Sequence, residues 1–535
     1  MDRTLLTRHK GDYLAGSFFQ SGSDGRIVDV DPATGVPLDT LPYRAAAVDE
    51  AVADAREAHT AWGGARVEQR CDILRRVRDV LEGRRGSLAA MLSREMGKTL
   101  WEANLECVAA VRAIDLLLEQ APPVLRETPH PTAPGSVRRR PMGVVGAVTP
   151  APYPIYGPIQ LLVPALLAGN AVVWNPASSV PLTSQRLAEV FDGGRIPARI
   201  LSMVQGPRDP VGHKLVAHPD VDLLLANGSR SSMEAVRAAR GTRATWTQNG
   251  GKGWAIVCAD ADLDRAAYEV VTGAFLSSGQ RSNATSRVLV ERKVAREFLR
   301  RVVALTNGLT VGAPSDGDSF CGPLGEGPQL QAFAATLKAW ADAGVPFPVE
   351  GGADRLARSM KRAGQCYAAP AIALLDGPLP PDLTPPEEVE GPLLLARLVD
   401  DAEQAALAYN DHPYGLAAAV FTESELRFAG LSQILEAGVV NWNRGTIVAS
   451  ARYPNAALRA SGHGAEANGE LMRVCTWSQS SLGAAGRFNP AHRVPGMTWP
   501  EAMGVIDPSS VSTPPYRPDD DTTDLVPPEL LPTKS

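Results

Sequence analysis

The sequence is poor in cysteine, has no paired metal-ligand motif and carries no surplus of positive charge. Its 535 residues contain six cysteines that lie far apart, and no two of them form a CxxC pair. We therefore expect neither a disulfide scaffold nor a metal site. The formal net charge of −6 argues against a nucleic-acid groove or a polybasic membrane surface as the main function.

Long apolar runs are missing as well. The chain opens with MDRTLLTRHK, which contains no apolar stretch suited to a signal peptide. The most apolar long stretch, residues 158–174, includes Pro164, Gly169 and Asn170 and stops short of a membrane span. We therefore expect a soluble, cytoplasmic protein. Its composition, 44% hydrophobic and 21% charged, is typical of a globular chain.

Strand and helix patterns alternate over most of the chain. Apolar residues follow helical spacing from about residue 48 to residue 119, and the prolines from Pro122 onward are expected to end this region. Between residues 144 and 251, strands alternate with helices as in parallel βαβ units. The predicted strands there are GVVGAVTP, NAVVWNPAS and VDLLLANGS, with helices at 159–167 and 182–191. A second α/β region contains the predicted strands WAIVCA, SRVLVER, PLLLARLV and LAAAVFT.

Eight sequence blocks occur in a characteristic order and spacing. They are TPAPYP at 149–154, VPALLAGNAVVWNPAS at 163–178, NGS at 227–229, QNGGK at 248–252, GQRS at 279–282, EEVEGP at 387–392, HPYGLAAAVFT at 412–422 and VVNWN at 439–443. Taken together, they resemble the aldehyde dehydrogenase superfamily over about residues 10–485. Two further blocks, REMGKTLWEA at 94–103 and GVVNWNRGT at 438–446, most resemble the succinylglutamate semialdehyde dehydrogenase branch.

The resemblance implies an α/β fold with a Rossmann-type cofactor domain, an α/β catalytic domain and a small strand element that exchanges between subunits. The predicted segments are the N-terminal part of the cofactor-binding domain (1–125), an oligomerisation strand segment (126–143), the Rossmann-like domain (144–250), the catalytic-type domain (251–440), a return segment with an oligomerisation strand (441–488) and a Pro-rich extension (489–535). We expect a homodimer or higher homo-oligomer. The extension is a candidate binding segment for a protein partner.

The reacting positions that the resemblance implies hold residues that do not suit the reaction. Family members attack the aldehyde with a cysteine thiolate directly after GQR, where this chain has Ser282. A hydroxyl forms almost no alkoxide at neutral pH without an adjacent base. Gln248 replaces the carboxylate base and cannot take a proton, and Pro152 replaces the asparagine that donates to the oxyanion. We therefore expect the ordinary dehydrogenase mechanism to be absent.

The cofactor positions that the resemblance implies are only partly kept. Gly228 and Ser229 match the pyrophosphate turn at a helix N-terminus, and Glu388 matches the ribose-binding glutamate. A plain strand-to-helix turn and a solvated loop carboxylate are the alternative interpretations. Asn175 replaces a lysine that contacts the adenosine ribose; further departures are Ser178, Met233 and Glu390. We expect no bound cofactor, or weak binding of NAD or NADP.

Three functions stay open. The main hypothesis is an inactive homologue kept as a binding or assembly component, because polar working positions are lost while core segments such as VPALLAGNAVV are intact. The second is an active NAD(P)-dependent, succinylglutamate semialdehyde-like dehydrogenase with an atypical site. The third is cofactor-independent acyl transfer at Ser282, for which no histidine lies near in sequence to act as a base.

Overall fold

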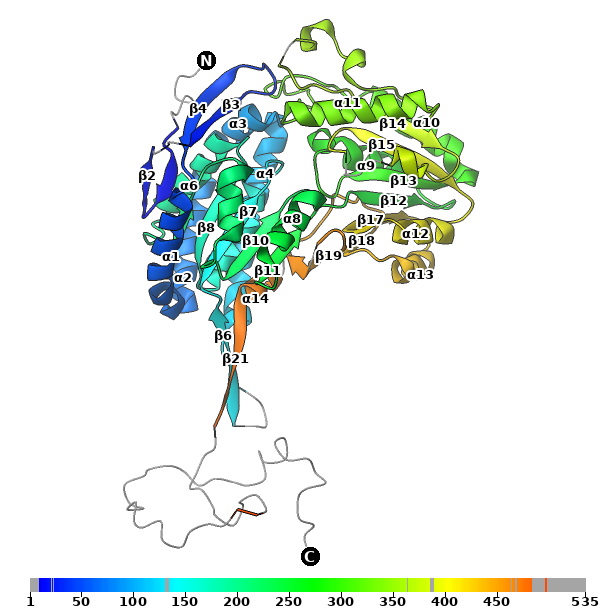
Figure 1. Cartoon of the computed structure of the whole chain (residues 1–535). Helices are drawn as coiled ribbons and strands as arrows, with labels where there is room; N and C mark the ends of the chain where they lie inside the picture. Colours follow the sequence, from blue (N-terminus) through cyan, green and yellow to red (C-terminus); the bar gives the residue numbers. More distant parts are fainter. Residues whose placement is uncertain are drawn as a thin grey trace, which may run out of the picture.

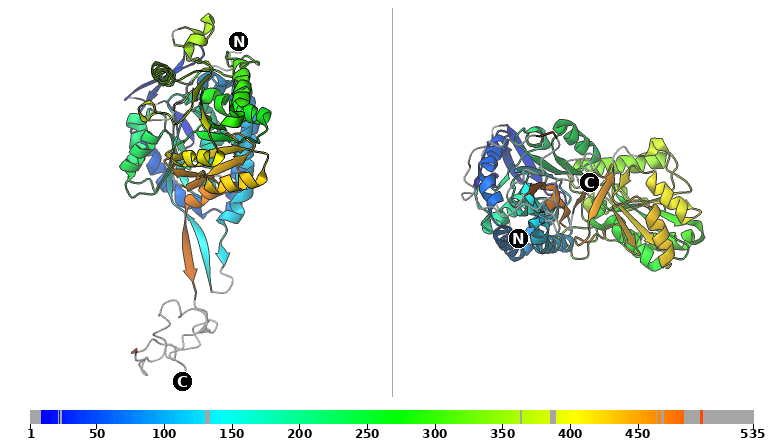
Figure 2. Two further views of the ribbon diagram at one scale, coloured as in Figure 1. Left: turned by 90° about the vertical axis from the view of Figure 1, so that its right-hand side faces the viewer. Right: turned by 90° about the horizontal axis from the view of Figure 1, so that it is seen from below.

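Two α/β lobes lie side by side and a narrow arm projects from one of them (Figure 1). The computed structural model describes residues 9–20, 22, 24–129, 134–362, 364–384, 389–462, 464–466, 469–483 and 496–497. Figure 2 shows the arm extending well away from the body of the molecule. Both lobes combine sheets with helices, so the α/β class that the sequence predicts is confirmed. The boundaries of the predicted segments stay a proposal.

The first lobe is built on a seven-stranded sheet in the order β11-β10-β7-β8-β9-β1-β2. Its strands are β11 (Thr245–Gln248), β10 (Leu223–Asn227), β7 (Val144–Thr149), β8 (Ala171–Pro176), β9 (Leu201–Met203), β1 (Asp12–Leu14) and β2 (Ser17–Phe19). The strands from β7 to β11 are parallel, whereas β1 pairs antiparallel with β9 and β2. The connecting helices are α5 (Tyr156–Leu167), α6 (Pro181–Gly193), α7 (His213–Ala217) and α8 (Arg230–Arg240). The three strands and two helices predicted between residues 144 and 251 are confirmed.

Four N-terminal helices complete this lobe, the first against the sheet and the other three mainly against α5, α6 and one another. They are α1 (Ala47–Gly64), α2 (Val67–Gly83), α3 (Arg85–Met96) and α4 (Leu100–Leu125), and a separate hairpin of β3 (Gly25–Val30) and β4 (Pro37–Tyr43) precedes them. The expectation that Pro122 ends the helical region is wrong, because α4 includes both Pro122 and Pro123. Both prolines fall in the last turn, where each removes one N–H bond to the carbonyl four residues earlier. The burial of Ala121 and Leu125 keeps this turn on the core.

The second lobe contains a fully parallel six-stranded sheet in the order β14-β15-β13-β12-β17-β18. Its strands are β14 (Ala371–Leu375), β15 (Leu393–Val399), β13 (Thr285–Glu291), β12 (Gly253–Val257), β17 (Ala417–Phe421) and β18 (Val439–Trp442). The main helices are α9 (Leu263–Phe275), α10 (Arg292–Asn307), α11 (Gly327–Asp342), α12 (Ala402–Asn410) and α13 (Glu425–Ile434). All four strands predicted in this region are confirmed.

The arm is a three-stranded antiparallel sheet that joins distant parts of the chain. It consists of β5 (Thr128–Pro129), β6 (Gly135–Pro141) and β21 (Thr476–Leu482), with β6 in the middle. A second small sheet contains β16 (Tyr414–Gly415), β19 (Asn455–Arg459) and β20 (Gly464–Glu466), and α14 (Glu470–Val474) leads into β21. The Pro-rich extension falls outside the described residues except for Gly496 and Met497.

Two kinds of feature are absent from the described ranges. No helix there is both long enough and apolar enough to cross a membrane. No group of three or more histidine, cysteine or acidic side chains is placed to hold a metal ion, again among the described residues only.

A buried acid lies in the hairpin of β3 and β4. Asp29 is 1% exposed, and its carboxyl group lies beside the buried carboxyl group of Glu95. Burial raises the pKa of Asp29 from an ordinary value of about 3.9 to about 7; a hydrogen bond with Glu95 acts in the opposite direction, and the charge of Asp39 adds to the rise. The folded protein therefore holds a proton there that the unfolded chain releases between these two pH values.

We predict that Asp29→Asn stabilises the protein at pH 8 but not at pH 4. A raised acid pKa makes the folded state lose stability as pH rises from about 4 to about 7, by up to about 4 kcal/mol for this shift. Urea unfolding at both pH values measures the difference. The exposed Asp318→Asn is the control. The prediction is wrong if Asp29→Asn changes the free energy of unfolding by the same amount at pH 4 and at pH 8.

Candidate functional site

Ser282 lies on the surface, directly after a sharp turn between α9 and β13. Its side chain is exposed and makes no hydrogen bond within the described part of the chain. Among the described residues, none therefore acts as the adjacent base that would activate the hydroxyl for acyl transfer. The structure gives no support for the third hypothesis.

No cysteine takes over the role of a nucleophile. All six cysteines of the chain belong to the described residues, and every one is buried and free of disulfides. Burial raises the pKa of all six thiols, to about 12 for Cys107, Cys258 and Cys321. Since the thiolate is the reactive form, none of them is a reactive thiol at neutral pH. The sequence predicts Cys258 as a buried residue within the strand WAIVCA; it is buried, and it lies one residue past the end of β12.

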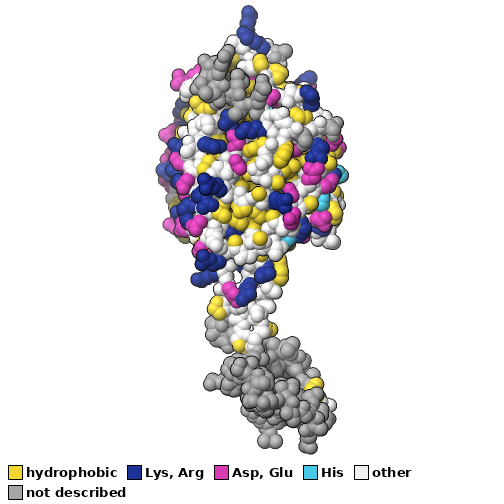
Figure 3. All heavy atoms as spheres, turned by 90° about the vertical axis from the view of Figure 1, so that its left-hand side faces the viewer, with side chains coloured by type: hydrophobic (Ala, Val, Ile, Leu, Met, Phe, Trp, Pro, Cys, Tyr) yellow, Lys and Arg dark blue, Asp and Glu magenta, His cyan; other side chains and the backbone are white. Residues whose placement is uncertain are grey.

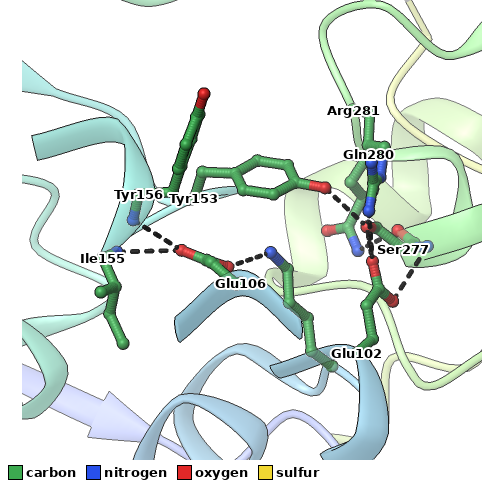
Figure 4. Close-up of polar contacts among 9 residues, drawn as sticks. Glu102, Glu106, Tyr153, Ile155, Tyr156, Ser277, Gln280 and Arg281 are labelled. Atoms are coloured by element: carbon green, nitrogen blue, oxygen red, sulfur yellow. Dashed lines mark hydrogen bonds and ion pairs between the residues drawn. The ribbon is translucent and has the colours of Figure 1, made fainter. Parts of the chain in front are cut away.

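A buried polar network joins α4 to Tyr153 and to Ser277, which lies in the turn before Ser282 (Figure 4). Lys98, which precedes α4, pairs with Glu106 of α4 at 2.5 Å between Nζ and Oε2, and both side chains are almost fully buried. The Lys98 ammonium also lies 3.6 Å from the centre of the Tyr153 ring. Burial lowers the pKa of Lys98, but the charges of Glu106 and its neighbours outweigh burial and the pKa is raised overall. Lys98 is therefore charged at neutral pH.

Glu106 also fixes the loop that carries Pro152. Its Oε1 accepts the backbone N–H groups of Ile155 and Tyr156, at 3.0 and 3.1 Å, just where α5 begins. A carboxylate at a helix N-terminus satisfies free N–H groups and interacts favourably with the helix dipole. Tyr153 in the same loop places its hydroxyl 3.2 Å from the Ser277 hydroxyl. The loop of Pro152 is thus tied to the turn that precedes Ser282.

The segment of Gln248 reaches the same place. Gln248 ends β11, and its carbonyl accepts the N–H of Gly228 at 3.2 Å. Four residues later, the Lys252 ammonium donates to the carbonyl of Gly279 at 2.6 Å. The structure therefore brings together the segments that contain the three predicted catalytic positions. These contacts are made by residues close to Ser282, Gln248 and Pro152 in the chain. The catalytic roles of these three residues themselves stay predictions.

Gly228 and Ser229 form the turn between β10 and α8, on the side of the first lobe that faces the second (Figure 1). The Ser229 hydroxyl caps α8 by accepting the N–H of Ser232 at 3.3 Å. Met233 is buried, and a Cβ at Gly228 would lie 3.0 Å from its methyl group. The helix N-terminus expected for a pyrophosphate is present, but Met233 fills the space beneath the turn.

The remaining predicted cofactor positions fit less well. Asn175 is buried, and its amide donates to the carbonyls of Val204 and Gly206, so it braces the end of β8. Glu390 accepts a hydrogen bond from the Gln329 amide of α11. Glu388 lies outside the described residues. The residues present therefore fit a dinucleotide at the turn of α8 but not at Asn175.

A cavity of about 490 Å³ lies between α8 and the second lobe. Its lining includes Arg230 of α8, together with Arg287, His412 and several apolar side chains. Burial, together with the charges of Arg287 and Arg459, lowers the pKa of His412 to about 3, so this ring is neutral at pH 7. The volume is in the range of small-molecule sites.

Sequence reasoning missed the network around Lys98. Lys98, Glu102 and Glu106 recur every four residues, a spacing that normally indicates a solvated face of alternating charge. Their burial follows from contacts with Tyr153, Ser277 and Arg281, which lie 50 or more residues away. The block REMGKTLWEA contains Lys98 and Glu102, but from the sequence alone it indicated only a resemblance to one branch of the superfamily.

Comparison with known proteins identifies relatives over nearly the whole chain. The model of the aldehyde dehydrogenase family matches residues 18–480. An alpha-ketoglutaric semialdehyde dehydrogenase of Bacillus subtilis is 32% identical, over 86% of this chain and 95% of its own. An N-succinylglutamate 5-semialdehyde dehydrogenase of Burkholderia mallei is 30% identical, over 90% and 98%. The structure of an NAD-dependent aldehyde dehydrogenase from Sinorhizobium meliloti has a TM-score of 0.85 with 27% identity, over 92% and 98%.

These similarities confirm the predicted superfamily but not the predicted branch. Two semialdehyde dehydrogenases of different specificity match almost equally well. The expectation that no cofactor binds is not supported, because a protein of this fold is named as NAD-dependent.

We predict that Glu106→Gln destabilises the protein by about 3–5 kcal/mol, because it leaves the Lys98 ammonium buried without its ion-pair partner. Urea unfolding measures the loss. The exposed pair of Glu127 and Arg138 supplies the control, and Glu127→Gln should leave the unfolding midpoint in place. The double variant Lys98→Met with Glu106→Gln should recover much of the loss, because it removes the unpaired ammonium and keeps an oxygen for the N–H groups of Ile155 and Tyr156. An unchanged midpoint for Glu106→Gln would show that the pair is unimportant.

Proposed function

The chain belongs to the aldehyde dehydrogenase family, and we propose that it has lost the thiolate-dependent dehydrogenase reaction and acts as a binding or assembly component. The observation that carries this proposal is the absence of an exposed thiol: Ser282 occupies the surface position, and all six cysteines are buried. A dehydrogenase of this type must form a covalent bond to the aldehyde before hydride can leave. A serine hydroxyl without a base cannot form that bond at a useful rate.

The replacements at Gln248 and Pro152 support the same proposal. An amide at position 248 cannot accept the proton of a hydrolytic water, and loss of such a base typically reduces the rate by about 10²–10⁴-fold. Proline at position 152 has no N–H to donate to a developing oxyanion, and one missing donor costs about 10²–10³-fold. Even a residual reaction would therefore be slow.

A second candidate is an NAD(P)-dependent dehydrogenase that oxidises a semialdehyde by an atypical site. The comparisons taken alone favour this candidate over the first, since the similar proteins bear the names of semialdehyde dehydrogenases. The retained turn of Gly228 and Ser229 is its support within this chain. We propose the succinylglutamate semialdehyde-like substrate class for this candidate, and weak binding of NAD or NADP in either case.

We predict that the purified protein forms no NADH or NADPH from alpha-ketoglutaric semialdehyde or N-succinylglutamate 5-semialdehyde. Absorbance at 340 nm with each cofactor measures the reaction. Turnover that is abolished by Ser282→Ala would overturn the proposal and establish the second candidate. Turnover that Ser282→Ala leaves unchanged would indicate a contaminating enzyme.

Calorimetric titration with NAD⁺ and NADP⁺ is the companion measurement to this assay. Weak binding without turnover is the result expected from the partial fit around α8. Replacing Gly228 by valine, which would contact Met233, should then abolish the heat of binding. Micromolar binding together with turnover would again favour the dehydrogenase.

We also propose that the arm mediates self-association. Six of the seven residues of β21 are exposed, including Trp477 and Leu482, and Val137 of β6 is exposed as well. A three-stranded sheet with both faces open buries too little apolar surface to be stable by itself. In the view of Figure 3, charged side chains of both signs cover the body, and some lie on the arm, where Arg138 pairs with Glu127. From the sequence alone, we also propose that the Pro-rich extension at 489–535 binds a protein partner.

We predict that Trp477→Ala weakens self-association by about tenfold or more, as truncation of a central interface tryptophan commonly does. Light scattering coupled to size exclusion at micromolar concentration measures the mass. Leu426 of α13 is also a large apolar residue on the surface, 86% exposed, but it lies outside the arm. Leu426→Ala is therefore the matched control, and it should leave the mass unchanged. A monomeric unaltered protein would exclude the assembly role.

A further inference from the structure

The turn that precedes Ser282 is strained. Ser277 has φ 56° and ψ 32°, Ser278 has φ 51° and ψ 34°, and Gly279 follows with φ 72°. The left-handed conformation disfavours a residue that carries a Cβ by about 1–2 kcal/mol. Two such serines in succession persist only where surrounding contacts hold them. We call residues 277–281 the strained turn.

Glu102 of α4, from the first lobe, makes the most contacts with this turn (Figure 4). One carboxylate oxygen accepts the backbone N–H of Ser277 at 3.1 Å, and the other accepts the hydroxyl of the same serine. The second oxygen also lies 3.2 Å from Nη2 of Arg281. The Glu102 side chain is 3% exposed, so these bonds are shielded from water. One carboxylate thus binds both ends of the strained turn.

Other contacts close the turn from the second lobe. The Gln280 amide donates to the carbonyl of Ser277 at 3.0 Å and accepts the N–H of Gly325 at 2.9 Å. The Ser278 hydroxyl donates to the carbonyl of Gly322 at 2.8 Å. These contacts come from the lobe to which the turn belongs. From the first lobe, the Tyr153 hydroxyl reaches only the Ser277 hydroxyl, at 3.2 Å, whereas Glu102 binds both Ser277 and Arg281.

We propose that Glu102 is the positioning residue of the strained turn, and that it holds position 282 in a fixed orientation relative to the first lobe. The turn cannot relax to an unstrained conformation while its N–H, its hydroxyl and Arg281 are bound to one buried carboxylate. The proposal concerns the conformation of position 282 and does not depend on whether the unaltered chain oxidises aldehydes.

A spin label at position 282 tests the proposal directly. Because the six native cysteines are buried, Ser282→Cys introduces an exposed thiol that a methanethiosulfonate label can modify selectively. We expect an immobilised spectrum, and a mobile one after Glu102→Ala is added. Glu102→Asp should restore part of the immobilisation. Glu119→Ala, an exposed glutamate of the same helix, is the control that should change nothing.

A second measurement covers the case in which Glu102→Ala does not fold. Glu102→Gln keeps one acceptor oxygen, and circular dichroism verifies its fold. Amide exchange in the peptide that contains residues 277–281 should become at least about tenfold faster, as expected for the loss of one buried charged hydrogen bond. An immobile label and unchanged exchange in a folded Glu102 variant would overturn the proposal. A label that is already mobile in Ser282→Cys alone would do so too.

Discussion

The ion pairs on one face of α4 are the interaction on which the arrangement of the candidate site depends. Glu102 and Glu106 lie four residues apart, so both carboxylates project from the same side of the helix. Glu106 holds the loop before α5, and Glu102 holds the turn before β13. Ions buried at such a junction are costly unless each is paired and hydrogen-bonded. The helix therefore fixes two loops at once, and neither can move without leaving a charge unpaired.

The lobes and their strands could be predicted from the sequence, because their signals are local. Runs such as GVVGAVTP and PLLLARLV are apolar and bounded by turn residues, and each forms the predicted parallel strand. The addition of β1 and β2 to the first sheet could not be predicted. Tyr13 pairs with Met203, 190 residues away, and no local pattern specifies a partner at such a distance. The helix that continues through Pro122 was missed for the same reason, since buried contacts of its last turn outweigh the local rule.

At the site, residue types could be predicted and side-chain directions could not. The sequence alone places serine at 282, glutamine at 248 and proline at 152, and their chemistry follows from the side chains themselves. For Asn175, however, the sequence predicts only the loss of a lysine. The structure adds that the amide turns inward to the carbonyls of Val204 and Gly206. The burial of all six cysteines likewise depends on packing between segments that are distant in sequence.

The strain before Ser282 bears on why such a chain keeps this architecture. Two left-handed serines store about 2–4 kcal/mol, taking about 1–2 kcal/mol for each, and the bonds of Glu102 offset that strain. Glycine at either position would remove part of it without disturbing the fold, because glycine adopts this region freely. Ser277 and Ser278 instead contribute hydroxyls that bind Glu102 and Gly322. The Ser277 hydroxyl therefore connects the two lobes through Glu102, and the Ser278 hydroxyl fixes the turn within its own lobe. Neither contact involves the side chain of residue 282, so the turn can keep its conformation whether that position holds a serine or a thiol.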